Sequence, residues 1–320
     1  MTLLTQRPYV GTVDHAALAD FLNLCAECDR LDNFTTPANL DLAFTVPGIN
    51  PAQDVCFWED SQGSIIAFCG LRFPQDDVAP LDSSLWFRIH PKARRQGLMS
   101  DILAWAEQRV RHVGRDRQLP VQLRAGSRAT LHYRIEDLEA YGFCQDRCFH
   151  TLQRSLDIPI QHPSLPNGFI IRDNKGEEEA DAWVAMFNQS FIDHWNHHPL
   201  RVERYLHWFN DPNYRSDLNL VAIAPDGTLT SFCYGEIDSA YNQHKNCREG
   251  WIELLGTRRG FRRKGLGRAL LLEGMTRLKA AGMDTAKIGV DSQNPSGAYS
   301  LYEAVGFHLL HTGLSFVKEL

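Results

Sequence analysis

Hydrophobic and polar positions in the last third of the chain predict strands and helices in alternation. A strand-like run covers 251–255, and a helix-like run extends from Arg268 to about residue 281. A short strand beginning at Ile288 is followed by a turn and a second helix, which ends at Gly306 before a new strand starts at Phe307. The predicted order is strand, helix, strand, helix and closing strand.

This order is predicted twice along the chain, which decides the number of domains. Residues 94–99 (Arg-Arg-Gln-Gly-Leu-Met) match 262–267 (Arg-Arg-Lys-Gly-Leu-Gly) at an offset of 168, and 138–143 match 302–307 at an offset of 164. Three prolines between 159 and 166 suit neither a helix nor a central strand. The sequence predicts an N-terminal domain over 1–156, a linker over 157–167 and a C-terminal domain over 168–320.

The turn at 262–267 carries the most informative chemistry. A glycine-containing turn between a strand and a helix leaves backbone N–H groups unpaired, and the helix dipole adds positive potential, so a phosphate is favoured there. Gly265 and Gly267 would let the backbone approach the ligand, where a Cβ would intrude. A Walker A loop requires Gly-Lys followed by Ser or Thr, but here Lys264 precedes Gly265 and no hydroxyl follows. A dinucleotide-binding fingerprint requires a third small residue where this chain has Leu270. Neither loop type fits. The alternative is a solvated, basic helix start.

The segment resembles the (Gln/Arg)-x-x-Gly-x-(Gly/Ala) signature of the GNAT superfamily of acyl-CoA-dependent N-acyltransferases. Residues 294–307 are similar to the Asn-x-x-(small)-x-x-x-Tyr-(Glu)-x-x-Gly-Phe segment of the same superfamily. The resemblance implies an α/β (α+β) fold of two tandem GNAT domains, each with a mixed, mostly antiparallel central sheet splayed at strand 4 and flanked by helices. It also implies an N-acetyltransferase with acetyl-CoA as its cosubstrate.

The resemblance assigns residues to acetyl-CoA. The turn would hold the diphosphate, Asn294 would bond the pantetheine arm, and a backbone N–H within 255–257 would polarise the thioester carbonyl, with Gly256 as a plausible bulge residue. The implied cofactor-binding set is Leu255, Gly256, Thr257, Arg262, Arg263, Lys264, Gly265, Leu266, Gly267, Arg268 and Asn294.

Tyr302 is the implied general acid, with its hydroxyl near the thioester sulfur. A thiol has a lower unperturbed pKa than a phenol, but transfer becomes possible as charge develops on sulfur. The alternative is an ordinary tyrosine packing on an amphipathic helix.

Glu253 is the candidate base, because an alkylammonium is mostly protonated at neutral pH. Alternation would place it on one strand face with Trp251, Leu255 and Thr257. The alternative is that Glu253 pairs with an arginine such as Arg258 and only stabilises the site.

The first copy lacks the implied catalytic groups. Leu138 stands where the second copy has Tyr302, and no asparagine matches Asn294. The side chain of Met99 would crowd a diphosphate, although Arg94, Arg95 and the turn amides would still hold coenzyme A weakly. We expect chemistry in the second copy and a structural or substrate-shaping role for the first.

The segment 191–199 (Phe-Ile-Asp-His-Trp-Asn-His-His-Pro) is expected to roof the acceptor pocket. His194 or His198 would orient or deprotonate an amine, and Trp195 would stack on a sugar or ring. These histidines alternatively satisfy buried backbone groups, and no metal-ligand spacing emerges.

The tandem arrangement resembles the mycothiol synthase branch of the superfamily. Members of that branch carry an acid directly after the His-Pro of the acceptor loop, where this chain has Leu200, and a lysine in the hairpin, where this chain has Glu236. These departures, with the acids Glu236 and Glu253, favour a small, cationic amine as the acceptor. The implied acceptor-binding set is His194, Trp195, His198 and Glu236.

Composition limits the remaining classes. A net charge of −6 and a pI near 6.1 argue against binding of nucleic acid or anionic membranes. No apolar run approaches a membrane span and no signal-peptide pattern opens the chain, so a cytoplasmic protein is expected, as a monomer or weak homodimer. Eight cysteines in 320 residues predict free thiols rather than disulfides or zinc ligands. The alternative functions are a GNAT acting on a protein amine and a non-catalytic acyl-CoA sensor.

Overall fold

The computed structural model describes residues 4–294 and 296–320, which form two compact units. The first unit contains the chain up to Cys148 together with Gly313–Leu320, and the second contains Phe149–Thr312. The predicted linker 157–167 lies inside the second unit, and its place as a domain boundary stays a prediction.

The first unit is built around the strand order β1-β2-β3-β4-β5-β12. Up to residue 140 it contains β1 (Thr5–Pro8), α1 (His15–Cys28), α2 (Pro37–Thr45), α3 (Pro51–Asp54), β2 (Val55–Glu59), β3 (Ile65–Arg72), β4 (Leu81–Ile89), α4 (Leu98–Arg117), β5 (Val121–Arg128) and α5 (His132–Ala140). Neighbouring strands are antiparallel except β4 and β5, which are parallel. Side chains alternate between the two sheet faces, so Cys69 of β3 packs in the core with α4, whereas Phe68 packs with α1.

The second unit repeats this plan with the order β6-β11-β10-β9-β8-β7. It contains β7 (Ile170–Asp173), α6 (Ala180–Phe191), α7 (Val202–His207), β8 (Asn219–Ile223), β9 (Leu229–Glu236), α8 (Ser239–Lys245), β10 (Glu249–Thr257), α9 (Leu266–Ala280), β11 (Thr285–Asp291) and α10 (Ala298–Ala304). Only β10 and β11 pair in parallel. Cys233 of β9 packs with α9, whereas the preceding residue, Phe232, packs with α6. These two helices therefore cover opposite faces of the sheet.

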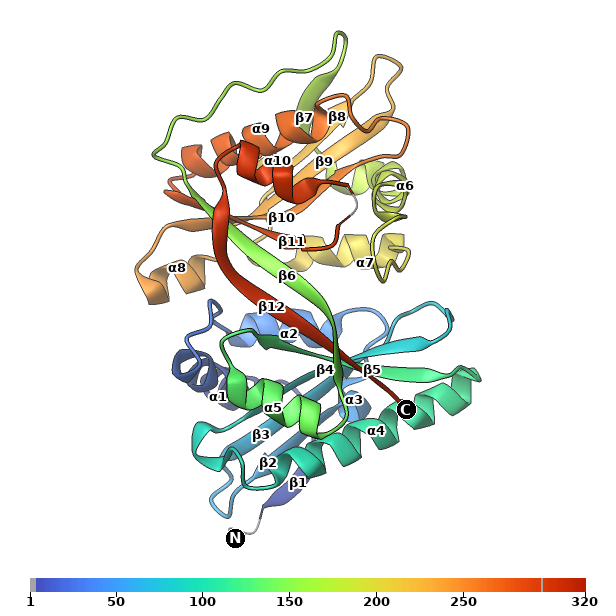
Figure 1. Cartoon of the computed structure of the whole chain (residues 1–320), viewed down its shortest axis with the longest axis vertical. Helices are drawn as coiled ribbons and strands as arrows, with labels where there is room; N and C mark the ends of the chain where they lie inside the picture. The colour runs from blue at the N-terminus through green and yellow to red at the C-terminus, as the bar shows by residue number, and fades with distance from the viewer. Residues whose placement is uncertain (1–3, 295) are drawn as a thin grey trace. The chain divides into compact units, whose positions relative to one another are not determined.

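Two long strands, β6 (Cys144–Ser155) and β12 (His308–Glu319), are divided between the units (Figure 1). Residues 313–319 of β12 pair with β5 in the first unit, and residues 149–155 of β6 pair with β11 in the second. Each sheet is therefore completed by the closing strand of the other repeat. The sequence pattern predicts a closing strand for each copy but does not identify its partner.

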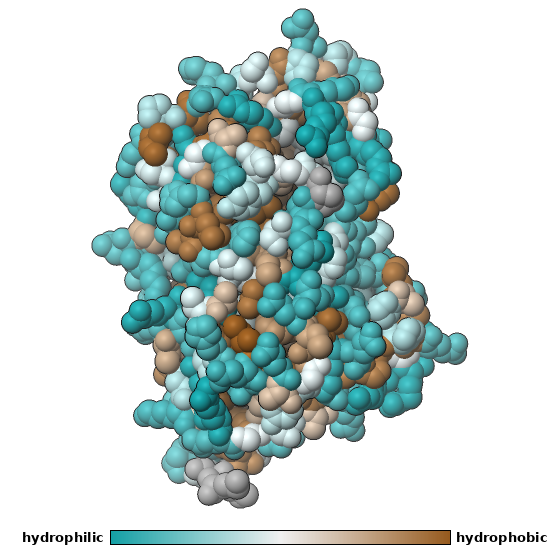
Figure 2. Space-filling view, in the orientation of Figure 1, coloured by the Kyte–Doolittle hydropathy of each residue, from teal (hydrophilic) through white to brown (hydrophobic). Residues whose placement is uncertain are grey.

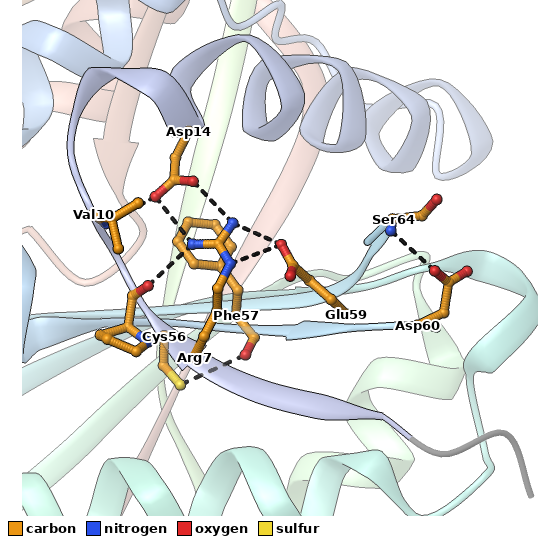
Figure 3. A network of polar contacts seen from close by, with 9 residues as sticks. Arg7, Val10, Asp14, Cys56, Phe57, Glu59, Asp60 and Ser64 are labelled. Carbon is orange, nitrogen blue, oxygen red and sulfur yellow. Dashed lines mark hydrogen bonds and ion pairs between the residues drawn. The ribbon is translucent and has the colours of Figure 1, made fainter. Parts of the chain in front are cut away.

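The four-residue edge strand β1 is held in the first unit by Arg7. Its Nε donates to Glu59 Oε1 at 2.8 Å and its Nη2 to Asp14 Oδ1 at 2.8 Å, while its guanidinium lies 4.6 Å from the ring centre of Phe57 (Figure 3). Asp14 also accepts a hydrogen bond from Val10 N at 2.9 Å. Charge-assisted bonds from a single arginine thus fix the strand to its neighbour and to the start of α1.

The predicted fold class is confirmed, since each unit has a mixed, mostly antiparallel sheet flanked by helices. The face drawn in Figure 2 is mainly hydrophilic, with hydrophobic residues in small, separate groups. Of the helices in the described residues, none is long and apolar enough to cross a membrane.

Candidate active site

The turn before α9 has the backbone geometry of an anion-binding cradle. Gly265 at the helix N-cap has φ +83°, and Arg263 has φ +64°, so both lie in the left-handed region. Ala269 N donates to Gly265 O at 3.0 Å, and the N–H groups of residues 266–268 therefore point past the helix end without an acceptor inside the helix. Together with the helix dipole, these donors favour a phosphate group.

Glycine is needed at the two positions of this turn, 265 and 267, for different structural reasons. A Cβ at Gly265 would meet nothing within 4 Å, so the positive φ is what calls for glycine there. A Cβ at Gly267 would lie 3.3 Å from Thr257 Oγ1, so this position faces β10. The expectation that Gly267 clears space for a ligand is therefore wrong; glycine there clears space for Thr257.

Arg262 braces the turn. Its Nε donates to Thr257 O at 3.3 Å, its Nη1 to Asp193 Oδ2 at 2.7 Å and its Nη2 to Ser190 O at 2.9 Å. Arg259 also pairs with Asp193. The guanidinium of Arg262 is thus committed to holding β10 and the end of α6 together.

The other cations of the turn are differently placed. Within the described residues, neither Arg263 nor Lys264 forms an ion pair, and Lys264 Nζ lies 5.1 Å from the ring centre of Phe261. Arg268 Nη2 donates to Gln161 Oε1 at 2.5 Å. Across the described ranges, Arg263, Lys264 and Arg268 therefore have no carboxylate partner, and Arg268 is the one held by a side-chain amide.

A gap opens beside this turn, between β10 and β11. The parallel pairing joins Glu249–Ile252 to Thr285–Ile288, and the described residues that follow in the two strands do not pair with each other. Arg258 N donates to Thr230 O at 2.8 Å toward β9. By the alternation of an antiparallel ladder, the N–H groups of Leu255 and Thr257 then point away from β9, into the gap. The predicted splay at the fourth strand of the domain is confirmed.

The bulge of β10 lies at Glu253 and not at Gly256, which corrects the prediction. The register with β9 shifts between Ile252 and Leu254, whereas Gly256 pairs regularly with Phe232. The shift also interrupts the side-chain alternation. Leu254 packs in the core cluster on the α6 face, and Leu255 packs in the cluster on the α9 face. Glu253 is a charged neighbour of Glu236 and Tyr234 of β9. The regular alternation predicted from Glu253 to Leu255 is therefore interrupted at the bulge.

Gly256 has a packing role that can be tested. A Cβ there would lie 2.4 Å from Phe232 Cζ and 3.1 Å from Ser190 Cβ. We expect Gly256→Ala to lower the free energy of unfolding by about 1–3 kcal/mol, because the core must shift to admit it. Denaturant titration measures the change, with Gly289→Ala as the control, since a Cβ at Gly289 meets nothing within 4 Å. Equal losses for the two variants would contradict the packing role.

Tyr302 lies within α10, and Asn294 lies in the turn before it. Tyr302 is 5 % exposed and packs in the same core cluster as α9, with its ring centre 6.2 Å from that of Phe307. Burial raises the pKa of its hydroxyl well above the ordinary value, so the hydroxyl keeps its proton at neutral pH. Asn294 Oδ1 accepts a hydrogen bond from Ser296 N at 2.8 Å, so the carbonyl end of its side chain shapes the turn before α10.

An acidic group lies on the α6 face of β9 and β10. Burial, and then the negative charges of Glu253, Asp211 and Asp238, together raise the pKa of Glu236 to about 8. Burial, then the charge of Asp211, raises the pKa of Glu253, whose side chain keeps contact with solvent although protein surrounds it on most sides. In the described part of the chain, no ion pair joins Glu253 to Arg258, the alternative partner considered from the sequence.

Asp211, Tyr214 and Tyr234 complete this group and were not predicted. The rings of Tyr214 and Tyr234 stack with centres 6.0 Å apart, and Tyr234 has Glu236, Asp211 and Glu253 as charged neighbours. Asp211 and Tyr214 lie in the loop after α7, which has no hydrophobic period. An Asp-Pro-Asn turn was the available signal, but it indicates only a turn.

The raised pKa of Glu236 predicts how stability depends on pH. Because the folded pKa lies above the usual value of 4.5, the native state binds more protons between about pH 4.5 and 8, and stability falls as pH rises through this window. We expect Glu236→Gln to raise Tm by about 2–4 °C at pH 8.5 and by less at pH 5. Thermal unfolding at both pH values measures it, with exposed Glu303→Gln as the control. An equal Tm change at the two pH values would contradict the assignment.

The loop after α6 places the predicted acceptor residues in the second unit. His194 Nδ1 donates to Trp195 O at 2.9 Å, which leaves Nε2 of the neutral ring as an acceptor. Trp195 lies against Phe149 with ring centres 5.8 Å apart, and His198 is half-buried in the same loop. Leu200 is buried in the α6 core, so the position after His-Pro offers no polar group to a ligand.

The structure thus brings the predicted residues into two sets. The turn, the gap and Tyr302 form one set around α9, and the acids of β9 and β10 form the other on the opposite face. No group of His, Cys, Asp or Glu in the described residues has an arrangement that would hold a metal ion. All eight cysteines are free thiols, and the Cys25 and Cys28 pair lies within helix α1 as predicted.

Comparison with known proteins identifies the family. The Acetyltransferase (GNAT) family matches residues 19–132 and 180–307, which include the turns at 94–99 and 262–267. The mycothiol acetyltransferase of Salinispora arenicola (strain CNS-205) is 31% identical over 172 residues, covering 52% of this chain and 53% of that protein. The mycothiol acetyltransferase of Streptomyces coelicolor (strain ATCC BAA-471 / A3(2) / M145) is 28% identical over 271 residues, covering 80% of this chain and 77% of that protein. The chain spans about half the length of the first of these relatives.

Solved structures agree on the fold. A GCN5-related N-acetyltransferase from Sphaerobacter thermophilus superposes with a TM-score of 0.74 at 23% identity, covering 99% of this chain and 95% of that chain. A tandem GNAT protein from the clavulanic acid biosynthesis pathway gives a TM-score of 0.71 at 16% identity, covering 99% and 98%. The chain belongs to the Acetyltransferase (GNAT) family and is a tandem GNAT protein similar to the mycothiol acetyltransferases.

Proposed function

We propose that the second unit transfers the acetyl group of acetyl-CoA to the primary amine of a small, cationic acceptor. The observation that carries this proposal is the gap between β10 and β11 beside the open N-terminus of α9. The turn would bind the diphosphate through the N–H groups of residues 264–268 and the charges of Arg263 and Lys264. The pantetheine arm would then enter the gap, where strand N–H groups have no partner strand.

The residues around the gap supply the steps of acyl transfer. Glu253 would take a proton from the ammonium group, directly or through water, and the neutral nitrogen would then bond to the thioester carbonyl carbon. The N–H groups of Leu255 and Thr257 would donate to the oxyanion that forms. As the C–S bond breaks, the Tyr302 hydroxyl would give its proton to the sulfur. The nitrogen would lose its second proton, which would return through water to the Tyr302 oxygen, and the proton on Glu253 would return to solvent.

The acceptor class follows from charge. Glu236, Glu253 and Asp211 lie together, and no lysine or arginine forms an ion pair with any of them within the described residues. A cationic acceptor would neutralise this group, and the stacked Tyr214 and Tyr234 would offer aromatic surface to its ammonium. The relatives are named as mycothiol acetyltransferases. The acids here and the buried Leu200 favour a more basic acceptor for this chain.

A panel of amines tests the function. The full chain is incubated with acetyl-CoA and with small diamines, amino sugars, zwitterionic amines or a lysine-containing peptide, while released thiol and product mass are followed. We expect acetylation of the cationic small amines. Acetylation of the peptide alone would favour a GNAT acting on protein amines. Binding of acetyl-CoA with no transfer to any amine would favour a sensor.

Glu253→Gln tests the base. We expect kcat/KM for the amine to fall by about 100-fold at pH 7, because the glutamine cannot accept the ammonium proton. The loss should shrink at high pH, where the amine is already neutral. Rates across pH 6–10 measure this change, and the same pH profile in both proteins would remove Glu253 from proton transfer.

A further inference from the structure

The first unit has the same gap as the second, but one of its own side chains fills it. The parallel pairing of β4 and β5 joins Leu81–Leu85 to Val121–Ala125, after which the described residues of the two strands no longer pair. His90 N donates to Ile66 O at 2.8 Å, so by the same alternation the carbonyl of Phe87 points away from β3, toward the gap.

Arg134 of α5 crosses this gap. Its Nε donates to Gly126 O of β5 at 2.8 Å, and its Nη1 donates to Phe87 O of β4 at 3.3 Å. Its guanidinium lies 3.8 Å from the ring centre of Phe87, and the residue is only 6 % exposed. Phe87 O also accepts a hydrogen bond from Arg88 Nη1 at 2.9 Å. Two arginines therefore occupy the carbonyl of β4, and Arg134 joins it to the carbonyl of β5.

The repeat shows what stands at this place in the second unit. Phe87 corresponds to Leu255 at the offset of 168, and Arg134 corresponds to Ala298 at the offset of 164. The methyl group of Ala298 is too short to cross between strands. The two gaps thus differ by Arg134, the long, buried side chain that bridges the strands, and by Arg88, whose counterpart at the offset of 168 is Gly256.

The phosphate turn of the first unit is also occupied. Gly97 has φ +87° and Arg95 has φ +60°, as in the second unit. Arg94 makes a bidentate pair with Asp29 at 2.8 and 2.9 Å, as its counterpart Arg262 pairs with Asp193 in the second unit. In contrast, Arg95 pairs with Glu136 at 2.7 Å, and position 300, which corresponds to Glu136, is a serine in the second copy. The carboxylate of Glu136 therefore takes the charge of one cation that a diphosphate would use.

Met99, in contrast, does not block this turn. Its side chain is 5 % exposed and packs in the core of the first unit, because its Cβ points inward like that of a residue at Gly267. The sequence-based expectation that Met99 crowds the diphosphate is therefore wrong. Leu138, at the place of Tyr302, is fully buried in the same core.

We propose that Arg134 closes the gap of the first unit to acyl-CoA, so that each chain binds one acyl-CoA, in the second unit. The second half of this statement rests on the function proposed above, whereas the closure rests on the first unit alone. Within the described residues, no carboxylate forms an ion pair with Arg134. Burial, with nearby Arg88 as a further cause, lowers the pKa of Arg134 to about 9.

Calorimetric titration of the full chain with acetyl-CoA tests the closure. We expect about one site per native chain and, in Arg134→Ala, about two, since the alanine removes the side chain that bridges the two strands. Arg134→Met, which keeps most of the volume without the charge, should stay at about one site and serves as the matched control. Near-ultraviolet circular dichroism checks that each variant is folded.

Two sites in the native chain, or one site in a folded Arg134→Ala variant, would overturn the proposal. Amide hydrogen exchange of the native chain covers the case in which Arg134→Ala does not fold. Acetyl-CoA should leave residues 87 and 97–100 unchanged, and protection there would overturn the closure. If the native chain binds no acetyl-CoA, the proposed function fails; a site gained in Arg134→Ala would still support the closure, and its absence would overturn it.

Discussion

Replacing Tyr302 with phenylalanine is expected to lower kcat for acetyl transfer by about 10²–10⁴-fold, the range of a lost general acid. The hydroxyl makes no hydrogen bond within the described residues, and the ring is buried beside Phe307. The substitution should therefore preserve packing and leave the affinity for acetyl-CoA within about twofold, since only the transition state uses the lost proton. Initial rates at saturating acetyl-CoA and amine measure kcat, and calorimetry measures affinity.

Tyr299→Phe is the matched control. Tyr299 lies on the same helix, with its ring centre 5.8 Å from that of His150, and it has no role in the proposed transfer. Its variant should keep kcat near that of the native chain. Equal rates for Tyr302→Phe and the native chain would take Tyr302 out of the mechanism and leave it as a packing residue.

Gly265→Val is expected to weaken acetyl-CoA binding by on the order of 10–100-fold. A β-branched residue at φ +83° costs about 1–3 kcal/mol, and relief of that strain would turn the N–H groups of the turn away from a common point. A loss of 1–3 kcal/mol in binding corresponds to roughly this change in Kd. Calorimetric titration of the variant with acetyl-CoA gives the value.

Gly282→Val separates strain from binding. Gly282 follows the other end of α9 with φ +90°, and a Cβ there also meets nothing within 4 Å. Its variant should lose similar stability but keep native affinity. If both valine variants bind acetyl-CoA as tightly as the native chain, the turn does not hold the diphosphate.

Local patterns predicted the elements around the site. The strand over 251–255 and the helix from 268 lie within β10 and α9 as found, because alternation and helical period depend on residues close in sequence. Gly265 was predicted in the turn before this helix, and the structure places it at the helix N-cap. The two copies were visible because their turn and Gly-Phe motifs repeat.

Features that depend on distant partners were not predicted. β6 and β12 end equivalent repeats, so nothing in either sequence tells which of β5 and β11 it joins. The bulge at Glu253 depends on the register with β9, and a bulge residue carries no marker of its own. Arg134 reads as an ordinary helix residue until the fold places Phe87 and Gly126 on either side of it.

Amide hydrogen exchange with and without acetyl-CoA tests the central claim most directly, because it shows where in the chain the ligand binds. The account predicts protection at residues 255–257, in the gap of the second unit, and at 264–268, in the turn before α9. Binding with no protection in either segment would contradict the account.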